Sequence, residues 1–313
     1  MILTVTLNPA IDKTIEVCGF KLGGLNKVIT VHQDPGGKGI NVSKVVKALG
    51  GESLATGILG DGPLETALDA LEIQHDFVKV SGQTRTNLKV FDSTTGETTE
   101  INEQGPEVDS FSVDAMLDKI AQISQEISIA VISGSAPKTL PRDIYGILIR
   151  RLKALGIKVF LDAEGELFSL ALAEKPHAIK PNRHELELYF NRVLSSNKSL
   201  SEAAHFFREK GIEEVYISLG SEGAYYLGNE GEYYLNPLKI KAHSSVGAGD
   251  AFVGAIVYAK EQAYPVEERL KLAVASSAGA VMTIGTKPMS REWIWNHVQS
   301  VQLTRIESEV PKA

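Results

Sequence analysis

Residues 246–250, with the sequence VGAGD, place two glycines and an acid at the start of a predicted helix. Glycines leave room for phosphate oxygens, and the free amides of a first helical turn form an anion hole. Such a hole stabilises the charge that builds on a γ-phosphoryl group during transfer, while Asp250 can accept the proton of an attacking hydroxyl group. Taken alone, a Gly-x-Gly-Asp sequence predicts a helix-capping aspartate more often than a catalytic one.

A second glycine-rich segment, GGKGIN at residues 36–41, lies far upstream in the same chain. Its three glycines permit close backbone approach to a ligand just before a helix begins. Lys38 can face an anion, and the amide of Asn41 can both donate to and accept from sugar hydroxyl groups. The GxxxxGK[ST] spacing of a P-loop is absent, so an ordinary glycine-rich turn remains the alternative.

A third segment, KPNRHE at residues 180–185, follows a short strand pattern and opens a helix. Asn182 and Glu185 are three residues apart and therefore share one helical face. Glu185 can hold Mg²⁺ through water, because this ion prefers oxygen ligands and keeps much of its hydration. The alternative is a capping box, in which both side chains serve only the helix start.

Strand and helix patterns alternate along most of the chain. Residues 2–7 alternate apolar side chains with threonine and end at an Asn-Pro turn, which indicates a strand. Strand-like runs at residues 127–132, 158–161, 178–180 and 214–219 are separated by helical patterns. The alternation predicts an α/β fold with a mainly parallel central sheet, covered on both faces and binding ligands at the carboxyl ends of its strands.

Two stretches interrupt this alternation. Residues 14–32 and 86–102 are rich in Val, Thr and Ile and contain turn residues but no helical pattern. They predict antiparallel hairpins that together form a small β-sheet lid over the ligand-binding edge. We therefore expect one domain over residues 1–313, with lid insertions near residues 12–33 and 86–103.

Composition limits the partners. The 313 residues carry a formal net charge of -7 and a pI near 5.6, which argues against nucleic acid or an anionic membrane as the main partner. Cys18 is the only cysteine, so no intramolecular disulfide can form. No signal-peptide pattern opens the sequence, and its apolar runs are too short for a membrane span. We expect a soluble, cytoplasmic protein.

The two glycine-rich motifs resemble the two signatures of the ribokinase/PfkB carbohydrate kinase family. Residues 180–185 are similar to that family's Asn-x-x-Glu motif, which is linked to Mg²⁺ and phosphate. The resemblance covers nearly the full chain in order, and TLNPAIDKT at residues 6–14 is similar to the opening of bacterial 1-phosphofructokinases. It implies a ribokinase-like three-layer sandwich with a small β-sheet lid.

The resemblance also assigns roles to single positions. It implies Asp250 as the catalytic base, with the amides of Gly247, Ala248 and Gly249 as the anion hole. The implied sugar-phosphate contacts are Asp12, Lys27, Gly37, Lys38, Asn41, Arg85 and Ser135, together with Asp250. The implied nucleotide contacts are Asn182, Ser218, Gly220, Ser221, Gly223, Gly247, Gly249 and Ser277, and Glu185 is the implied Mg²⁺ contact, through water.

The implied activity is ATP-dependent phosphorylation of a ketose phosphate, with Mg²⁺ as the metal and fructose 1-phosphate as the first candidate substrate. Tagatose 6-phosphate and fructose 6-phosphate are alternatives within the same class. A non-catalytic regulator that binds sugar phosphates is the alternative of another class. The exposed strand edges of the lid make a homodimer through the lid an open possibility.

Overall fold

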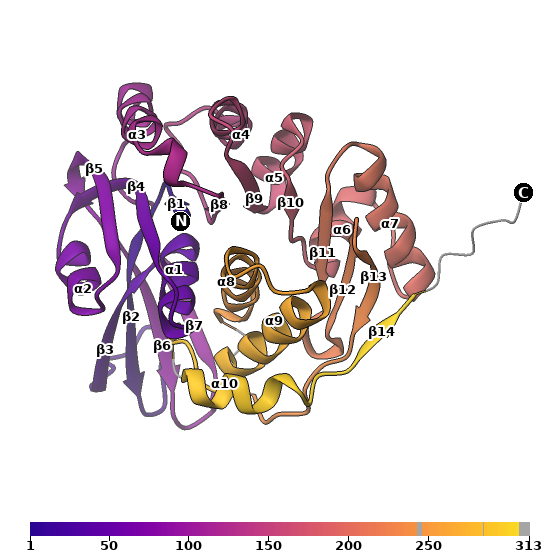
Figure 1. Ribbon diagram of the computed structural model, residues 1–313. Helices are drawn as coiled ribbons and strands as arrows, with labels where there is room; N and C mark the ends of the chain where they lie inside the picture. Colours follow the sequence, from indigo (N-terminus) through magenta and orange to yellow (C-terminus); the bar gives the residue numbers. More distant parts are fainter. Residues whose placement is uncertain (243–245, 284, 307–313) are drawn as a thin grey trace, which may run out of the picture.

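The computed structural model describes residues 1–242, 246–283 and 285–306; Ser245, which precedes the glycine-rich motif at residues 246–250, lies outside them. A large sheet of ten described strands forms the centre, in the order β14-β13-β12-β11-β10-β9-β8-β1-β4-β5 (Figure 1). Its strands are β1 (Ile2–Thr6), β4 (Ser53–Asp61), β5 (Gln74–Gln83), β8 (Ile129–Ser133), β9 (Lys158–Asp162), β10 (Ala178–Ile179), β11 (Glu214–Ser218), β12 (Ala224–Gly228), β13 (Gly231–Leu235) and β14 (Leu303–Arg305). The pairs from β5 to β11 are parallel, and the three pairs from β11 to β14 are antiparallel.

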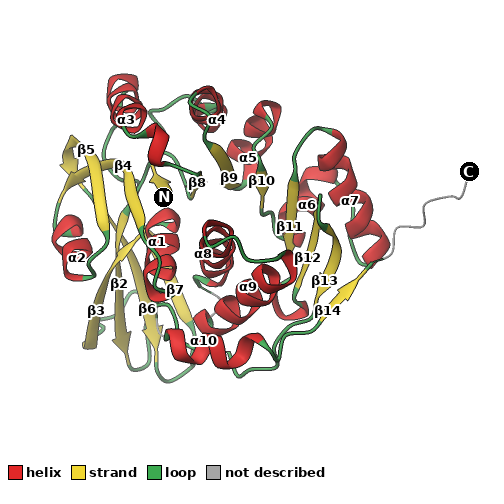
Figure 2. Ribbon diagram, viewed as in Figure 1, coloured by secondary structure: helices red, strands yellow, loops and turns green. Residues whose placement is uncertain are grey.

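Helices cover both faces of this sheet (Figure 2). One layer contains α3 (Ser110–Gln122), α4 (Ile144–Ala154), α5 (Gly165–Ala171), α6 (Arg183–Phe190) and α7 (Asn197–Glu209). The other contains α1 (Lys38–Ala48), α8 (Ala248–Glu261), α9 (Val266–Ala280) and α10 (Arg291–Val298), while α2 (Leu64–Ala70) packs beside β5. Alternate residues of β1 enter the two cores, with Leu3 and Val5 on one face and Ile2 on the other. The predicted three-layer α/β sandwich is confirmed.

The order of strands reverses around β1, which lies between β4 and β8. The chain runs from β1 toward β5 on one side, and from β8 toward β11 on the other. In open parallel sheets, ligands bind at such a switch point, outside the carboxyl ends of the strands. The topology therefore directs attention to the loops that follow β1, β8 and β9.

A second, smaller sheet is inserted at this edge. It has the order β3-β2-β6-β7 and is built from β2 (Ala10–Val17), β3 (Val28–Gly36), β6 (Arg85–Asp92) and β7 (Thr98–Asn102). The two predicted hairpins are present as antiparallel pairs, and β2 joins β6 in parallel register. Figure 1 shows the four strands gathered beside α1 and below β4 and β5. We refer to this sheet as the lid.

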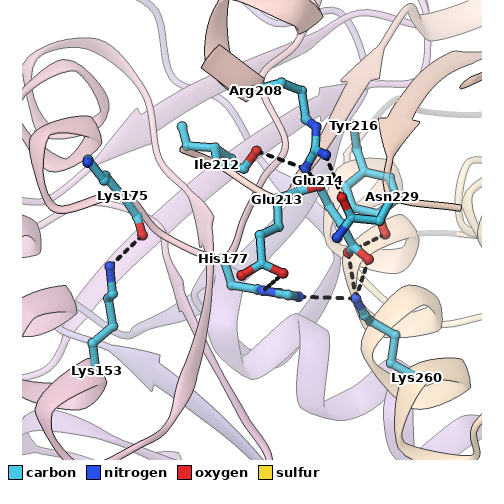
Figure 3. Close-up of polar contacts among 10 residues, drawn as sticks. All are labelled: Lys153, Lys175, His177, Arg208, Ile212, Glu213, Glu214, Tyr216, Asn229 and Lys260. Carbon is cyan, nitrogen blue, oxygen red and sulfur yellow. Dashed lines mark hydrogen bonds and ion pairs between the residues drawn. The ribbon is translucent and has the colours of Figure 1, made fainter. Parts of the chain in front are cut away.

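The far end of α8 is joined to the central sheet by an ion pair between the half-buried Lys260 and the buried Glu214 (Figure 3). Lys260, in the last turn of α8, donates to both carboxylate oxygens of Glu214 on β11, each at 2.5 Å. Tyr216 donates to the same carboxylate at 2.9 Å, and Nε2 of His177 lies 3.4 Å from the Lys260 ammonium group. The pair therefore restrains the position of α8 along its axis.

No helix in the described ranges is both long and apolar enough to cross a lipid bilayer.

Candidate active site

A cavity of about 1060 Å³ opens where the lid meets the carboxyl ends of the central strands. Thr6, Gly134, Asp162 and Ser218 line it from the ends of β1, β8, β9 and β11 or just beyond them. The lid closes the opposite wall with Asp12 and with residues of β6 and β7. The cavity thus lies at the switch point that the topology indicates.

Nearly all of the residues singled out in the sequence line this one cavity. They are Asp12, Gly37, Lys38, Asn41, Arg85, Ser135, Asn182, Glu185, Ser218, Gly220, Ser221, Gly223, Gly247, Ala248, Gly249, Asp250 and Ser277. Lys27 is the exception, because it is exposed in the lid and does not line the cavity. The fold therefore brings both glycine-rich motifs to a common space.

Asp250 lies in the first turn of α8, but it does not cap that helix. Gly247 is the N-cap residue, with φ 81°, and no side chain caps the helix start. The Asp250 carboxylate instead accepts a hydrogen bond from Nδ2 of Asn41 at 2.8 Å, across 209 residues of sequence. Gly247, Ala248 and Gly249 are half-buried and line the cavity, and the first amides of a helix have no partner within the helix. This contact joins the two glycine-rich motifs directly.

Burial raises the pKa of Asp250 to about 6, and the charge of Asp162 acts in the same direction. The hydrogen bond from Asn41 and the cations Lys38 and Lys180 oppose the rise in pKa. A carboxylate with a pKa of about 6 remains ionised at neutral pH and is more basic than an ordinary aspartate. Asp250 is therefore suited to accept a proton near neutral pH.

Two lysines place positive charge next to the helix start. Lys180 pairs with the buried Asp162 at 3.1 Å, and its Nζ lies 3.2 Å from the position that a β-carbon on Gly249 would occupy. Asp162 also raises the pKa of Lys38 against the effect of burial. Burial would raise the pKa of Asp162, but Lys180 and Lys38 hold it below its usual value. Asp162 therefore favours the charged form of Lys38, and the Lys180 ammonium group lies close to the start of α8.

The lid wall combines an acid with cations and amides. Asp12 accepts from Nδ2 of Asn87 at 2.9 Å and lies 3.6 Å from Nζ of Lys89, whose side chain is 10% exposed. Arg85 donates through Nε to the carbonyl of Asn8 at 3.1 Å. Within the described chain, the buried Oδ1 atoms of Asn8, Asn41 and Asn87 have no hydrogen-bond partner. These oxygens can accept hydroxyl hydrogens, and the cations can bind a phosphate.

A model of the pfkB carbohydrate kinases matches residues 5–293. The chain belongs to the pfkB carbohydrate kinase family. It is 37% identical over 283 residues to a 1-phosphofructokinase of Xanthomonas campestris, covering 88% of this chain and 89% of the relative. It is 35% identical over 311 residues to a 1-phosphofructokinase of Bacillus subtilis, covering 98% and 100%. The crystal structure of phosphofructokinase-2 from Escherichia coli in complex with substrates and products matches with a TM-score of 0.89 at 28% identity, covering 96% and 98%.

The resemblance seen in the sequence is thereby confirmed. The protein is an ATP-dependent carbohydrate kinase of the pfkB family, and ATP is its co-substrate. For a phosphoryl transfer, the cavity must hold a sugar hydroxyl and a polyphosphate next to one base. The cavity holds the buried Asp250 carboxylate, with polar groups of the lid on one side and the start of α8 on the other.

The kinase motif at residues 180–185 also has the local role that its alternative interpretation predicts. Asn182 caps α6 by accepting from the Glu185 amide at 2.8 Å, and the Glu185 carboxylate accepts from the Asn182 amide at 2.8 Å. This capping box uses one carboxylate oxygen, and both residues still line the cavity. Burial raises the pKa of Glu185. The structure therefore shows a helix cap whose two residues also line the cavity.

Two glycines that line the cavity, Gly220 at the start of η3 (Gly220–Glu222) and Gly223 just after its end, differ in what they contribute. Gly223 has φ 100°, and a β-carbon there would overlap the carbonyl oxygen of Leu235, so the turn itself requires glycine. Gly220 also has a positive φ, but a β-carbon there would meet open space. Ser277 lines the cavity from α9. This part of the cavity is shaped by backbone turns more than by charged side chains.

Several cavity residues of this kinase were not singled out from the sequence. They are Thr6, Asn8, Asn87, Lys89, Asn102, Asp162, Glu164, Lys180 and Thr286. A signal existed for some of them: Arg85, Asn87 and Lys89 alternate along one strand and so share a face, and Asp162 directly follows a buried apolar strand. Thr286 lies in an irregular segment and has no such signal.

Proposed function

We propose that this kinase transfers the γ-phosphoryl group of ATP to the free primary hydroxyl of D-fructose 1-phosphate, giving D-fructose 1,6-bisphosphate. The observation that carries the proposal is the Asp250–Asn41 contact at 2.8 Å, which sets a buried base between an anion hole and a wall of sugar contacts. Relatives at 35% and 37% identity that are named 1-phosphofructokinase support the choice of sugar. We also infer that residues 1–313 act as one kinase domain with the lid inserted.

In the proposed mechanism, Asn41 holds the Asp250 carboxylate so that it faces the hydroxyl group that attacks. As that oxygen bonds to the γ-phosphorus, Asp250 takes its proton, and the bond from the γ-phosphorus to the β,γ-bridging oxygen breaks to release ADP. The amides of Gly247, Ala248 and Gly249 receive the charge that spreads over the phosphoryl oxygens. Lys38 and Lys180 lower the energy of the same charge from the sheet side. Closure of the lid would exclude water and limit hydrolysis of ATP.

The residues present fit a magnesium ion that is held mainly by the nucleotide. The buried oxygen Oδ2 of Asp162 has no partner among described residues, and one oxygen of Glu185 remains outside the capping box. No group of three or more His, Cys, Asp or Glu side chains in the described ranges could hold a metal by itself. Mg²⁺ bound through water at Glu185 and by phosphates would neutralise charge on ATP.

We propose that Lys89, on the lid strand β6, contacts the phosphate of the sugar instead of Lys27. Lys89 lines the cavity with Arg85, whereas Lys27 does not. We expect Lys89→Met to raise the KM for fructose 1-phosphate about tenfold or more, with a smaller change in kcat, since a bound phosphate keeps its contacts through the transition state. Steady-state kinetics with varied sugar phosphate at saturating ATP measure this.

Lys13→Met is the matched control for Lys89, because Lys13 lies on the neighbouring strand and does not line the cavity. Its KM is expected to stay within about twofold of the unmodified protein. Equal KM values for Lys89→Met and the unmodified protein would remove Lys89 from the phosphate site.

The test of the substrate is a comparison of kcat/KM for fructose 1-phosphate, fructose 6-phosphate and tagatose 6-phosphate. We expect fructose 1-phosphate to give the highest value by at least tenfold. A higher value for either 6-phosphate would assign the chain to that alternative activity. Absence of ATP turnover with all three sugars, in a folded preparation, would favour the non-catalytic regulator.

We also propose a homodimer formed through the lid. The outer lid strand β3 and the loop before it expose Leu22, Leu25, Val28, Ile29 and Val31. An edge strand with exposed apolar side chains is well suited to pair with a second copy. Sedimentation of the protein is expected to show a dimer, and Ile29→Asp is expected to shift it toward monomer. Purely monomeric sedimentation at micromolar concentration would contradict this.

A further inference from the structure

A buried lysine of α1, Lys44, lies outside the cavity and has no role in the mechanism above. It is 5% exposed, which is rare for lysine because the ammonium group loses its hydration. Its Nζ donates to the carbonyl of Pro35 at 3.1 Å and to the hydroxyl of Thr286 at 2.8 Å. The two acceptors are separated by more than 200 residues in the sequence and belong to different elements of the kinase.

Pro35 is the next-to-last residue of the lid strand β3, so it belongs to the lid. Thr286 belongs to the segment between α9 and α10, and its Cα lies 3.7 Å from the position that a β-carbon on Gly247 would occupy. Gly247 caps α8 with φ 81° and has no side chain to hold it in place. Thr286 therefore backs the turn that forms the anion hole. Gly285 also approaches the lid, since a β-carbon there would lie 3.3 Å from Oδ2 of Asp34.

We propose that Lys44 is a positioning residue that ties the segment at Thr286, and through it the turn at Gly247, to the end of the lid strand at Pro35. The inference rests on the proposed phosphoryl transfer at Asp250. An ammonium group suits the task, because its three N–H donors can form hydrogen bonds to both acceptors at once. A neutral amine would hold the same acceptors less strongly.

The surroundings of Lys44 supply a second line of support. Acidic groups face it from three elements: Asp12 on β2, Asp34 on β3 and Asp250 on α8. Lys89 on β6 is the facing cation. Burial outweighs the acids and lowers the pKa of Lys44 to about 8. The charged form is then present at neutral pH and is lost as the pH rises above about 8.

The test is Lys44→Met, which keeps the length of the side chain and removes the charge. We expect kcat to fall about tenfold, with the KM for fructose 1-phosphate within about threefold, because the anion hole is used mainly in the transition state. Lys47→Met is the matched control: Lys47 lies three residues further along α1, is exposed and pairs with the exposed Glu72. Its kcat is expected to match the unmodified kinase.

The pH dependence of kcat distinguishes the proposed role of the Lys44 charge from a purely structural role of its side chain. The unmodified kinase should lose kcat with an apparent pKa near 8, and Lys44→Arg should retain most activity at pH 7 but lack this alkaline limb, because arginine stays charged. The variants Lys44→Met and Thr286→Val should be non-additive, with the double variant about as active as Lys44→Met. Equal kcat for Lys44→Met and the unmodified kinase, additive losses, or an alkaline limb that persists in Lys44→Arg would each overturn the inference. An inactive unmodified protein would instead refute the proposed function.

Discussion

Replacement of Asp250 by asparagine is expected to lower kcat at least 100-fold while the fold and the affinity for fructose 1-phosphate are kept. The amide has nearly the same shape as the carboxylate, and its oxygen can still accept from Asn41, so the cavity is not expected to collapse. It cannot, however, take the proton of the attacking hydroxyl, a role that contributes about 10²- to 10⁴-fold in rate. Turnover of ATP with saturating sugar phosphate measures kcat, and calorimetric titration measures sugar affinity.

The matched control is Asp118→Asn, which makes the same chemical change on the exposed face of α3 and should leave kcat unchanged. A purified Asp250→Asn protein with kcat within tenfold of the unmodified kinase would refute the assignment of the base. A loss of sugar binding comparable to the loss of kcat would indicate instead that Asp250 mainly holds the ground state.

The same variant should be more stable than the unmodified kinase at pH 7.5. Burial raises the pKa of Asp250 from 3.8 to about 6, so keeping it ionised in the folded state costs roughly 3 kcal/mol above pH 6. This cost falls as the pH drops from 6 toward 4, because Asp250 is protonated in the folded protein at a higher pH than in the unfolded chain. The stability gain from Asp250→Asn should therefore shrink at pH 5, as urea unfolding at the two pH values can measure. An acid carried at such a cost is consistent with selection for catalysis over stability.

Much of this site was predictable because its parts are local motifs. The glycine-rich segments at residues 36–41 and 246–250 predict two helix starts with accessible amides. The alternation of strands and helices predicts where the parallel strands end. The contact between Asn41 and Asp250 could not be predicted in this way. Nothing in their spacing predicts a contact across 209 residues, and only the order of strands around β1 brings the two helix starts together.

The charges of the site were harder to predict than its backbone. Asp162 and Lys180 each follow a short buried strand, but only the pairing of β9 with β10 shows that their side chains meet at 3.1 Å. The family resemblance implied a phosphate contact at Lys27, but Lys27 is exposed and does not line the cavity, whereas Lys89 does. The sequence of a strand shows which residues share a face, but it does not show which of the two faces the fold covers.

The antiparallel edge of the large sheet was also missed. Strands β12 and β13 are rich in tyrosine and are joined by a tight turn between Gly228 and Gly231, a pattern that indicates a hairpin. The sequence prediction ended at β11, because no functional motif drew attention to this stretch. This edge also contributes to the cavity, because Gly223 and Ala224 at the start of β12 line it.

The second large effect is expected far from the cavity, at the ion pair of Lys260 and Glu214 (Figure 3). Burial would raise the pKa of Glu214, but Lys260 outweighs it and holds the pKa below its usual value. Lys260→Met keeps the packing of the stem and leaves the carboxylate with the hydroxyl of Tyr216 alone. Removing one partner of a buried ion pair lowers the free energy of unfolding by about 3 to 5 kcal/mol. Because the hydrogen bond from Tyr216 remains, we expect a loss of about 3 kcal/mol.

Urea unfolding followed by circular dichroism measures this free energy, and Lys153→Met is the control. Lys153 donates to the carbonyls of Glu174 and Lys175 at 2.8 and 2.9 Å but faces no buried carboxylate there, so its loss should cost less than about 1 kcal/mol. Figure 3 shows Lys260 with Glu214 and Lys153 with the carbonyl of Lys175. An equal loss for the two variants would mean that the charge of Glu214 is not the source of the effect.

The origin of the effect can be tested by removing the second charge. Lys260→Met combined with Glu214→Gln should recover at least half of the lost stability, because no uncompensated carboxylate then remains. In Lys260→Met alone, the unpaired Glu214 should have a pKa above that of the unfolded chain, so its penalty should be largest at pH 7.5 and smaller at pH 5. The far end of α8 is attached by this pair and its near end carries Asp250, so kcat of the folded Lys260→Met protein reports whether the position of the base depends on an anchor ten residues away.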